Sequence, residues 1–83
     1  MFKVEIISGK DLKNLRESMG IGLGDVHRVT KISPTVLEAI ENDDIAHLPA
    51  TIYLKSFLRS YAEILQADAK KIVQGYLKNI GKG

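Results

Sequence analysis

The chain contains no cysteine and no tryptophan, and it has only two prolines in 83 residues. The absence of cysteine excludes disulfides and thiolate metal sites, which fits a reducing compartment. No apolar run approaches the roughly 18 residues that a membrane-spanning helix needs. The first residues also lack the apolar centre and the cleavage site of a signal peptide. A length of 83 residues predicts one small domain, and these absences lead us to expect a cytoplasmic one.

What the chain does contain is aliphatic residues and a mixture of charges. Hydrophobic residues make up 45% of the sequence, and most are leucine, isoleucine, valine and alanine, which favours helix-on-helix packing. The net charge of +2 is a weak signal, because many ordinary domains share it. The distribution of the charges along the chain is therefore more informative than their sum.

Apolar residues recur at spacings of three and four in five segments, and this periodicity predicts five helices. Their expected bounds are 9–19, 23–30, 34–43, 51–66 and 69–79. In the first two helices, the residues expected to face the core are Leu12, Leu15, Met19, Leu23, Val26 and Val29. In the polar loop over residues 42–49, Ile45 and Leu48 are expected to plug the core.

Capping residues mark the ends of these helices. Ser8 and Asp11 form a loose capping-box pattern, and Gly20 is well placed to end the first helix. Ser33 can cap the third helix, where Pro34 suits the first position because its missing amide hydrogen would be unpaired there. The predicted fold class is therefore an all-α, five-helix domain over residues 9–80.

The two ends of the chain fall outside this predicted domain. Residues 1–8 are predicted to form a short extended arm, because apolar and charged residues alternate between Phe2 and Ile6. The arm can either pack on the helices or pair with a second copy of the chain, and pairing would make the domain a homo-oligomer. Residues 81–83 are predicted to form a flexible tail.

The segment from Thr30 to Glu41 has the pattern of the turn and second helix of a helix-turn-helix. In a DNA-binding protein this second helix lies in the major groove. The candidate DNA contacts are then Arg28, Lys31, Ser33, Thr35 and Glu38.

The charges near this helix argue against DNA. Residues 33–50 contain no lysine or arginine, and they contain four acids: Glu38, Glu41, Asp43 and Asp44. One glutamate can accept a hydrogen bond from cytosine, but affinity depends on lysine and arginine at the phosphates. Basic residues of the first two helices can supply some of that charge. We favour a structural helix with a solvated acidic face, and DNA binding stays as the alternative.

The helix over residues 51–66 carries a second candidate site. Its rings and cations predict a protein-docking surface, because aromatic residues and arginine are common interface hot spots. The residues of this surface are Tyr53, Lys55, Phe57 and Arg59. The competing interpretation is that the rings belong to the core. We favour the core for Phe57 and for Tyr61, and both interpretations stay open for the other three residues.

No catalytic or metal-binding constellation is evident. The two histidines, His27 and His47, have no cysteine or convincingly spaced carboxylate beside them, so we expect no metal site. Asp43 and Asp44 lack the spaced ligands of a calcium loop. The glycines at 20, 22 and 24 follow no strand and indicate a helix connection rather than a phosphate loop. We therefore expect no cofactor and no enzymatic activity.

Several segments together resemble a known family. They are Leu12–Glu17, Thr30–Ser33, Leu37–Glu41, Leu48–Pro49 and Tyr53–Ala62, and the resemblance spans nearly the whole chain. The pattern is similar to the cytoplasmic helix-turn-helix domains of the RodZ type, within the lambda-repressor-like class. The resemblance implies a protein-interaction adaptor that docks an MreB-like bacterial actin, mainly through the helix over residues 51–66. It also implies a membrane-anchored parent, although similar domains occur fused to DnaJ-type modules.

Two positions depart from the family pattern. His27 stands where a small residue usually meets the next helix, so its ring either opens the helix pair or points to a rim. Lys31 stands where DNA-binding relatives often have glycine. If Lys31 adopts a positive φ, the backbone strain costs roughly 1 kcal/mol.

Overall fold

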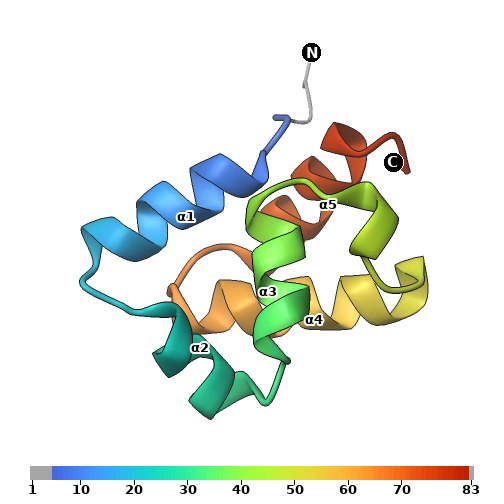
Figure 1. The fold of residues 1–83 in the computed structure, drawn as a ribbon. Coiled ribbons are helices and arrows are strands. Elements are labelled where there is room, and N and C mark those ends of the chain that lie inside the picture. The colour runs from blue at the N-terminus through green and yellow to red at the C-terminus, as the bar shows by residue number, and fades with distance from the viewer. Residues whose placement is uncertain (1–4, 83) are drawn as a thin grey trace.

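The computed structural model describes residues 5–82. In this range five α-helices follow one another: α1 (Gly9–Ser18), α2 (Leu23–Thr30), α3 (Pro34–Glu41), α4 (Thr51–Ile64) and α5 (Ala69–Asn79) (Figure 1). A single turn of 3-10 helix, η1 (Ile45–His47), interrupts the loop between α3 and α4. The predicted all-α, five-helix fold is confirmed. The third and fourth helices end at Glu41 and Ile64, slightly earlier than the periodicity suggested.

The predicted caps explain where the helices begin. The Ser8 hydroxyl accepts from the Asp11 amide at 3.1 Å, and the Asp11 carboxylate accepts from the Ser8 amide at 2.9 Å. This reciprocal pair is a complete capping box. The Ser33 hydroxyl accepts from the Val36 amide at 3.2 Å and starts α3. Gly20 follows α1 with a φ of +71°, a conformation that glycine adopts without strain.

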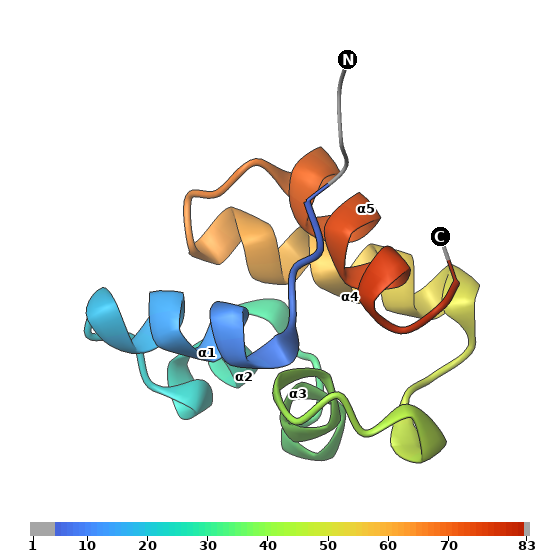
Figure 2. The ribbon, with the colours of Figure 1, turned by 90° about the horizontal axis from the view of Figure 1, so that it is seen from above.

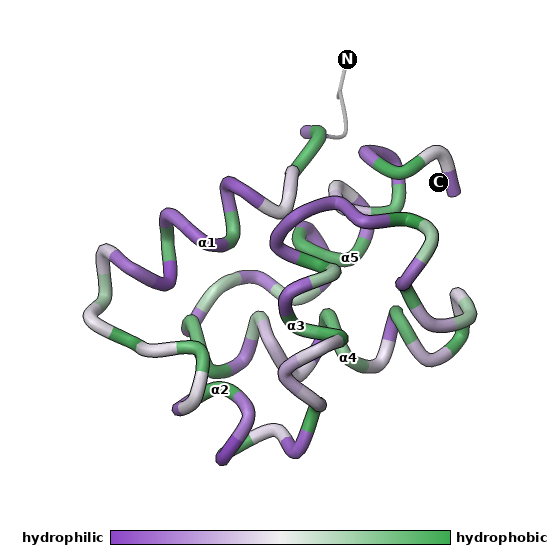
Figure 3. The backbone as a smooth tube through the Cα atoms, viewed as in Figure 1, coloured by the Kyte–Doolittle hydropathy of each residue, from purple (hydrophilic) through white to green (hydrophobic). Residues whose placement is uncertain are grey.

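The helices form two groups. Figure 2 shows α4 and α5 side by side as one group, and α1, α2 and α3 as a second group that faces them. The core fills the space between the groups, and its largest fully buried side chains are Tyr61, Tyr76, Leu12, Leu37, Ile40, Leu54, Leu58 and Val26. Figure 3 shows hydrophobic and hydrophilic residues alternating along the helices, as one buried face per helix requires.

The buried face of α1 differs from the predicted one. Gly9, Leu12 and Arg16 are buried, whereas Leu15 and Met19 are 38% and 40% exposed. The prediction that the last two face the core was wrong. The reason is close packing of α1 on α3, where a Cβ atom at Gly9 would collide with the α3 backbone. Because the two helices approach so closely at Gly9, the side of α1 that carries Gly9 and Arg16 is the side that faces α3.

Two further core predictions were also wrong. Val29 is 59% exposed, because α2 meets the core through Val26, while Leu23 is only half-buried. Ile45 is 55% exposed, because it lies on a shallow hollow with Leu48 and does not enter the sealed core. Leu48 is half-buried against the core, as predicted.

The described part of the arm packs on α5. The Ile7 amide donates to the Gly75 carbonyl oxygen at 3.1 Å, and Figure 2 shows this segment crossing α5. A Cβ atom at Gly75 would collide with the Glu5 carbonyl oxygen and the Ile7 side chain, so the crossing needs glycine. Phe2 and Val4, on which the arm prediction partly rested, lie outside the described residues. Pairing of the arm with a second copy stays a prediction.

The chain after α5 turns back on the helix. Gly81 has a φ of +78°, and the Lys82 amide donates to the Leu77 carbonyl oxygen at 2.8 Å. This bond satisfies a carbonyl group that the helix end would otherwise leave unpaired. Within residues 5–82, no helix combines the length and hydropathy that crossing a membrane would require.

Candidate protein-docking and DNA-contact surfaces

A buried ionic cluster lies where α1, α3 and α4 meet. Arg16 donates two hydrogen bonds to Glu41, from Nε to Oε2 at 2.7 Å and from Nη2 to Oε1 at 2.9 Å. The Tyr61 hydroxyl donates to the same carboxylate at 2.5 Å, and Arg16 Nη1 donates to the Ile21 carbonyl oxygen at 2.9 Å. The cluster satisfies each charged group by paired hydrogen bonds, as burial requires.

The cluster changes the ionisation of its members. The hydrogen bonds from Arg16 to Glu41 raise the pKa of the guanidinium further above its usual value. Burial, followed by the hydrogen bond to Glu41, raises the pKa of Tyr61 well above its ordinary value of 10.0. Arg16 therefore stays charged and Tyr61 stays neutral throughout the physiological range.

This cluster corrects the predicted acidic surface of the third helix. Glu41 was counted among its four acids, yet it is 6% exposed and neutralised by Arg16. Asp43 Oδ1 accepts from the Gly9 amide and from Asn79 Nδ2, both at 2.9 Å, which ties the loop to α1 and α5. In the part of the chain that the structure describes, Glu38 is the one acid of the four without a hydrogen bond or ion pair.

The predicted DNA-contact residues gather around the turn between α2 and α3. All five are exposed: Arg28, Lys31, Ser33, Thr35 and Glu38. The Arg28 guanidinium pairs with Asp25 at 2.9 Å, and this bond, with the Gly22 amide, lowers the pKa of Asp25. Among the described residues, Lys31 is thus the one cation of the set outside an ion pair.

The two departures from the family pattern both lie at this turn. Lys31 has a φ of +64°, so the predicted strain of roughly 1 kcal/mol applies. His27 is exposed, and its Nδ1 lies 2.8 Å from the Ile32 carbonyl oxygen. Because a carbonyl oxygen can only accept, Nδ1 carries the hydrogen and donates. The ring therefore lies at the rim of the helix pair and holds the turn.

The predicted docking residues of α4 separate into two surfaces. Successive residues of a helix are about 100° apart, so Tyr53 and Phe57 lie on one side of the buried stripe and Lys55 and Arg59 on the other. Tyr53 is 62% exposed and Phe57 is half-buried, and we call this pair the aromatic edge. Tyr61 is fully buried, in agreement with the core interpretation.

The two cations of α4 face a groove against α5. Its volume is about 550 Å³, and its lining residues are Lys55, Arg59, Ala69, Lys70, Val73, Gln74 and Leu77. We call this hollow the basic groove. No carboxylate lines it, and none of its three cations takes part in an ion pair with another described residue.

Sequence reasoning missed the contribution of α5 to this groove. On the sequence alone, Lys70, Val73 and Leu77 belong only to the helix expected over residues 69–79. The available signal was the short connection from Leu65 to Asp68, because a short loop between two helices makes them antiparallel neighbours. That proximity could have placed Lys70 beside the cations of α4.

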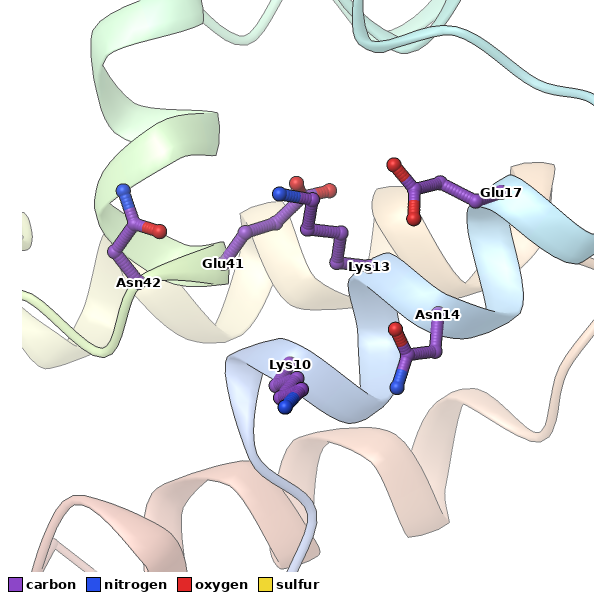
Figure 4. A pocket seen from close by; sticks show the side chains of 6 residues that line it. All are labelled: Lys10, Lys13, Asn14, Glu17, Glu41 and Asn42. Carbon is purple, nitrogen blue, oxygen red and sulfur yellow. The ribbon is translucent and has the colours of Figure 1, made fainter.

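A second open hollow lies between α1 and the C-terminal end of α3. Figure 4 shows its lining, which encloses about 360 Å³: Lys10, Lys13, Asn14, Glu17, Glu41 and Asn42. We call it the α1/α3 cleft. Two lysines and two glutamates line it, but Glu41 is already paired with Arg16, so Glu17 is the acid left to offset the lysines. No acid of the described chain lines the basic groove.

The remaining polar clusters are small. Within the described residues, no group of three or more His, Cys, Asp or Glu side chains is placed to hold a metal ion. His47 Nδ1 lies 2.8 Å from Asp44 Oδ2 within the loop. Gly22 precedes α2, and its amide donates to Asp25 at 2.9 Å, which makes the glycine-rich stretch a helix connection.

Comparison with known proteins identifies the family. The sequence profile of a helix-turn-helix domain family matches residues 11–72. The chain is 34% identical over 68 residues to the cytoskeleton protein RodZ of Streptococcus pneumoniae, which covers 82% of this chain and 25% of that protein. This chain is a RodZ-like helix-turn-helix domain.

Other relatives of this RodZ-like domain are membrane proteins. The uncharacterised membrane protein YmfM of Bacillus subtilis is 30% identical over 60 residues, or 72% of this chain and 21% of that protein. The solved structure of YmfM from Staphylococcus aureus, a membrane protein for which DNA binding has been suggested, matches with a TM-score of 0.76. It is 30% identical, and the match covers 87% of this chain and 88% of that one. The RodZ-like domain spans about a quarter of the length of its curated relatives.

Proposed function

We propose that this RodZ-like domain is a non-enzymatic adaptor that docks a cytoskeletal protein through the aromatic edge of α4. The observation that carries the proposal is the exposure of Tyr53, at 62%, beside Ile52, at 74%, in the first turns of α4. Tyrosine at an interface combines a large apolar area with a hydroxyl that can be hydrated or paired. A relative named as a cytoskeleton protein supports a filament partner, and an MreB-like bacterial actin is the first candidate.

The proposal includes the place of the domain in a longer protein. Two relatives of this domain are membrane proteins, and each is matched over a region that corresponds to most of this chain. A membrane-anchored parent with this domain on the cytoplasmic side would link its membrane to a cytoplasmic filament.

Cosedimentation with purified MreB filaments from the source bacterium tests the docking surface. We expect the domain to pellet with the filaments, and Tyr53→Ala to weaken this binding about tenfold or more, the size of a hot-spot truncation. Val29→Ala is the matched control, because Val29 is an exposed apolar residue on α2, with 59% exposure. Far-UV circular dichroism checks that both variants stay folded. Equal pelleting of Tyr53→Ala and the unmodified domain would refute the aromatic edge as the docking site.

A second candidate function is DNA binding through α3. The observation in its favour is the burial of Glu41 in its pair with Arg16, which leaves the solvent face of α3 less acidic than the sequence suggests. The suggested DNA binding of the S. aureus relative adds support. The weakness of this candidate is charge, because Lys31 is the one unpaired cation among the predicted contacts in the described residues.

Fluorescence anisotropy of a random-sequence DNA duplex tests this candidate at low and near-physiological salt. If DNA is the ligand, binding falls steeply with salt, because cations are displaced from the phosphates. Lys31→Glu then weakens binding, whereas the same reversal at Lys78, at the far end of α5, changes it much less. Absence of binding at low salt would remove DNA from consideration.

A further inference from the structure

We propose that the basic groove between α4 and α5 binds an acidic amphipathic segment of a protein partner. This site is separate from the aromatic edge and does not depend on the function proposed above. Lys55 and Arg59 form one wall on α4, and Lys70 on α5 contributes the third cation. The occupant is inferred from the charge of these walls and from the floor between them.

None of the three cations of the groove forms an ion pair with a described residue. Lys55 and Arg59 are one helical turn apart, where like charges repel each other. Lys70 adds a third positive charge from the facing helix, and no carboxylate lines the groove. A hollow lined by charge of one sign, over an apolar surface, concentrates its potential and attracts groups of opposite charge. A ligand with several carboxylates would relieve this repulsion.

The floor of the groove selects among acidic ligands. Ala69 and Val73 are half-buried and Leu77 is buried, and all three line the groove. Their spacing of four places them in a row along α5, which extends about 12 Å at 1.5 Å per residue. A free phosphate would leave this apolar row unused, and a membrane surface cannot enter a hollow. A helical segment of about two turns, with carboxylates flanking an apolar stripe, satisfies both the walls and the floor.

A designed peptide tests the proposal directly. The probe is a short fluorescein-labelled helical peptide with leucines along one face and glutamates beside them, and its twin has glutamine in place of glutamate. Fluorescence anisotropy measures the binding of each peptide to the whole domain. We expect the glutamate peptide to bind in a salt-sensitive manner. The affinity of the glutamine twin should be at least about tenfold lower.

Two double variants locate the site. Lys55→Glu with Arg59→Glu is expected to weaken binding of the glutamate peptide at least about tenfold. Lys10→Glu with Lys13→Glu makes the same change in net charge at the α1/α3 cleft, and it should change the affinity less than about twofold. A peptide with lysine in place of glutamate should bind the Lys55→Glu, Arg59→Glu variant more tightly than it binds the unmodified domain.

Further measurements separate this site from the others. Amide shifts in NMR titrations should concentrate at Lys70, Val73 and Leu77, and Tyr53→Ala should leave peptide binding unchanged. Equal losses in the two double variants would overturn the proposal, because they would show attraction by net charge alone. Binding to vesicles of anionic phospholipid without binding to the peptide would also overturn it, in favour of a membrane surface.

Discussion

The α1/α3 cleft and the basic groove each start from a helix with two cations, yet only the groove is lined by charge of one sign. In each hollow, one helix supplies two cations about one turn apart, Lys10 and Lys13 on α1 or Lys55 and Arg59 on α4. In the cleft, α1 adds Glu17 and α3 adds Glu41, which pairs with Arg16, whereas in the groove α5 brings a further lysine. The difference teaches that the charge of a surface depends on the facing helix as much as on the helix that carries the cations.

The same contrast separates two arginines. Arg16 and Arg59 both lie on amphipathic helices, yet Arg16 is 7% exposed and Arg59 lies at the surface. Burial of Arg16 is possible because Glu41 accepts two of its hydrogen bonds. Arg59 has no such partner among the described residues, so it stays in water and is available to a ligand. Substitutions that remove the partner of Arg16, or that remove the unpaired cations of α4, test this comparison between the buried and the exposed arginine.

The largest expected effect comes from Glu41→Ala. This change leaves the charge of Arg16 buried without a partner and removes the acceptor of the Tyr61 hydroxyl. We expect the free energy of unfolding to fall by about 3–5 kcal/mol, a large share of the stability of a small domain. Urea unfolding followed by circular dichroism measures this loss.

The control is Glu38→Ala on the exposed face of the same helix. Its free energy of unfolding should stay within about 0.5 kcal/mol of the unmodified domain. A loss below about 1 kcal/mol for Glu41→Ala would show that the cluster contributes little to the fold.

The buried hydroxyls predict a loss of stability in alkali. Burial is the main cause that raises the pKa of Tyr61 and of Tyr76 above the ordinary value of 10.0. Above pH 10 the unfolded chain therefore releases protons that the folded chain retains, so stability falls as the pH rises from about 10 towards the folded-state values. Titration of tyrosinate absorbance should show both residues ionising together with loss of the helical dichroism. Ionisation of all tyrosines in a fully helical protein would contradict this prediction.

A smaller effect distinguishes a packed glycine from an open one. Gly9→Ala places a methyl group against the α3 backbone, and we expect a loss of about 1–3 kcal/mol from overpacking. Gly24 lies in α2 with no atom within 4 Å of a built Cβ, so Gly24→Ala should stabilise the domain by about 0.5–1 kcal/mol. Thermal unfolding of the two variants measures whether each one loses or gains stability. Equal effects at the two positions would contradict the close approach of α1 to α3.

The smallest expected effect on stability comes from the two exposed cations of α4. Lys55→Ala with Arg59→Ala should change the free energy of unfolding by no more than about 0.5 kcal/mol, because neither cation has a partner in the described fold. Urea unfolding checks this value beside that of Glu41→Ala. A large loss would mean that these cations support the fold and are not free for a ligand.

The elements of this fold were predictable because their causes are local. The capping box of Ser8 and Asp11 and the cap at Ser33 each act across three residues, and both are present in the structure. Apolar spacing within single helices also located Leu12 and Val26 in the core. These signals act over one or two helical turns, and the sequence displays them directly.

The candidate sites were only partly predictable, because the sequence of α4 does not show which elements pack beside it. The ring of Tyr53 and the cations Lys55 and Arg59 are visible in the sequence. Their separation into an aromatic edge and a basic groove depends on α5, which brings Lys70 to one side. The acidity assigned to the third helix failed for the same reason, since Arg16 lies on another element.

The sequence by itself determined the number of helices, most of their bounds and the family of the domain. Only the tertiary structure decided that Arg16 lies inside and Leu15 lies at the surface, and which charges remain available to a partner. The physical reason is distance along the chain. Arg16 and Glu41 are 25 positions apart, and Asp43 and Asn79 are 36 apart, so only the packing of helices brings these groups within hydrogen-bonding distance.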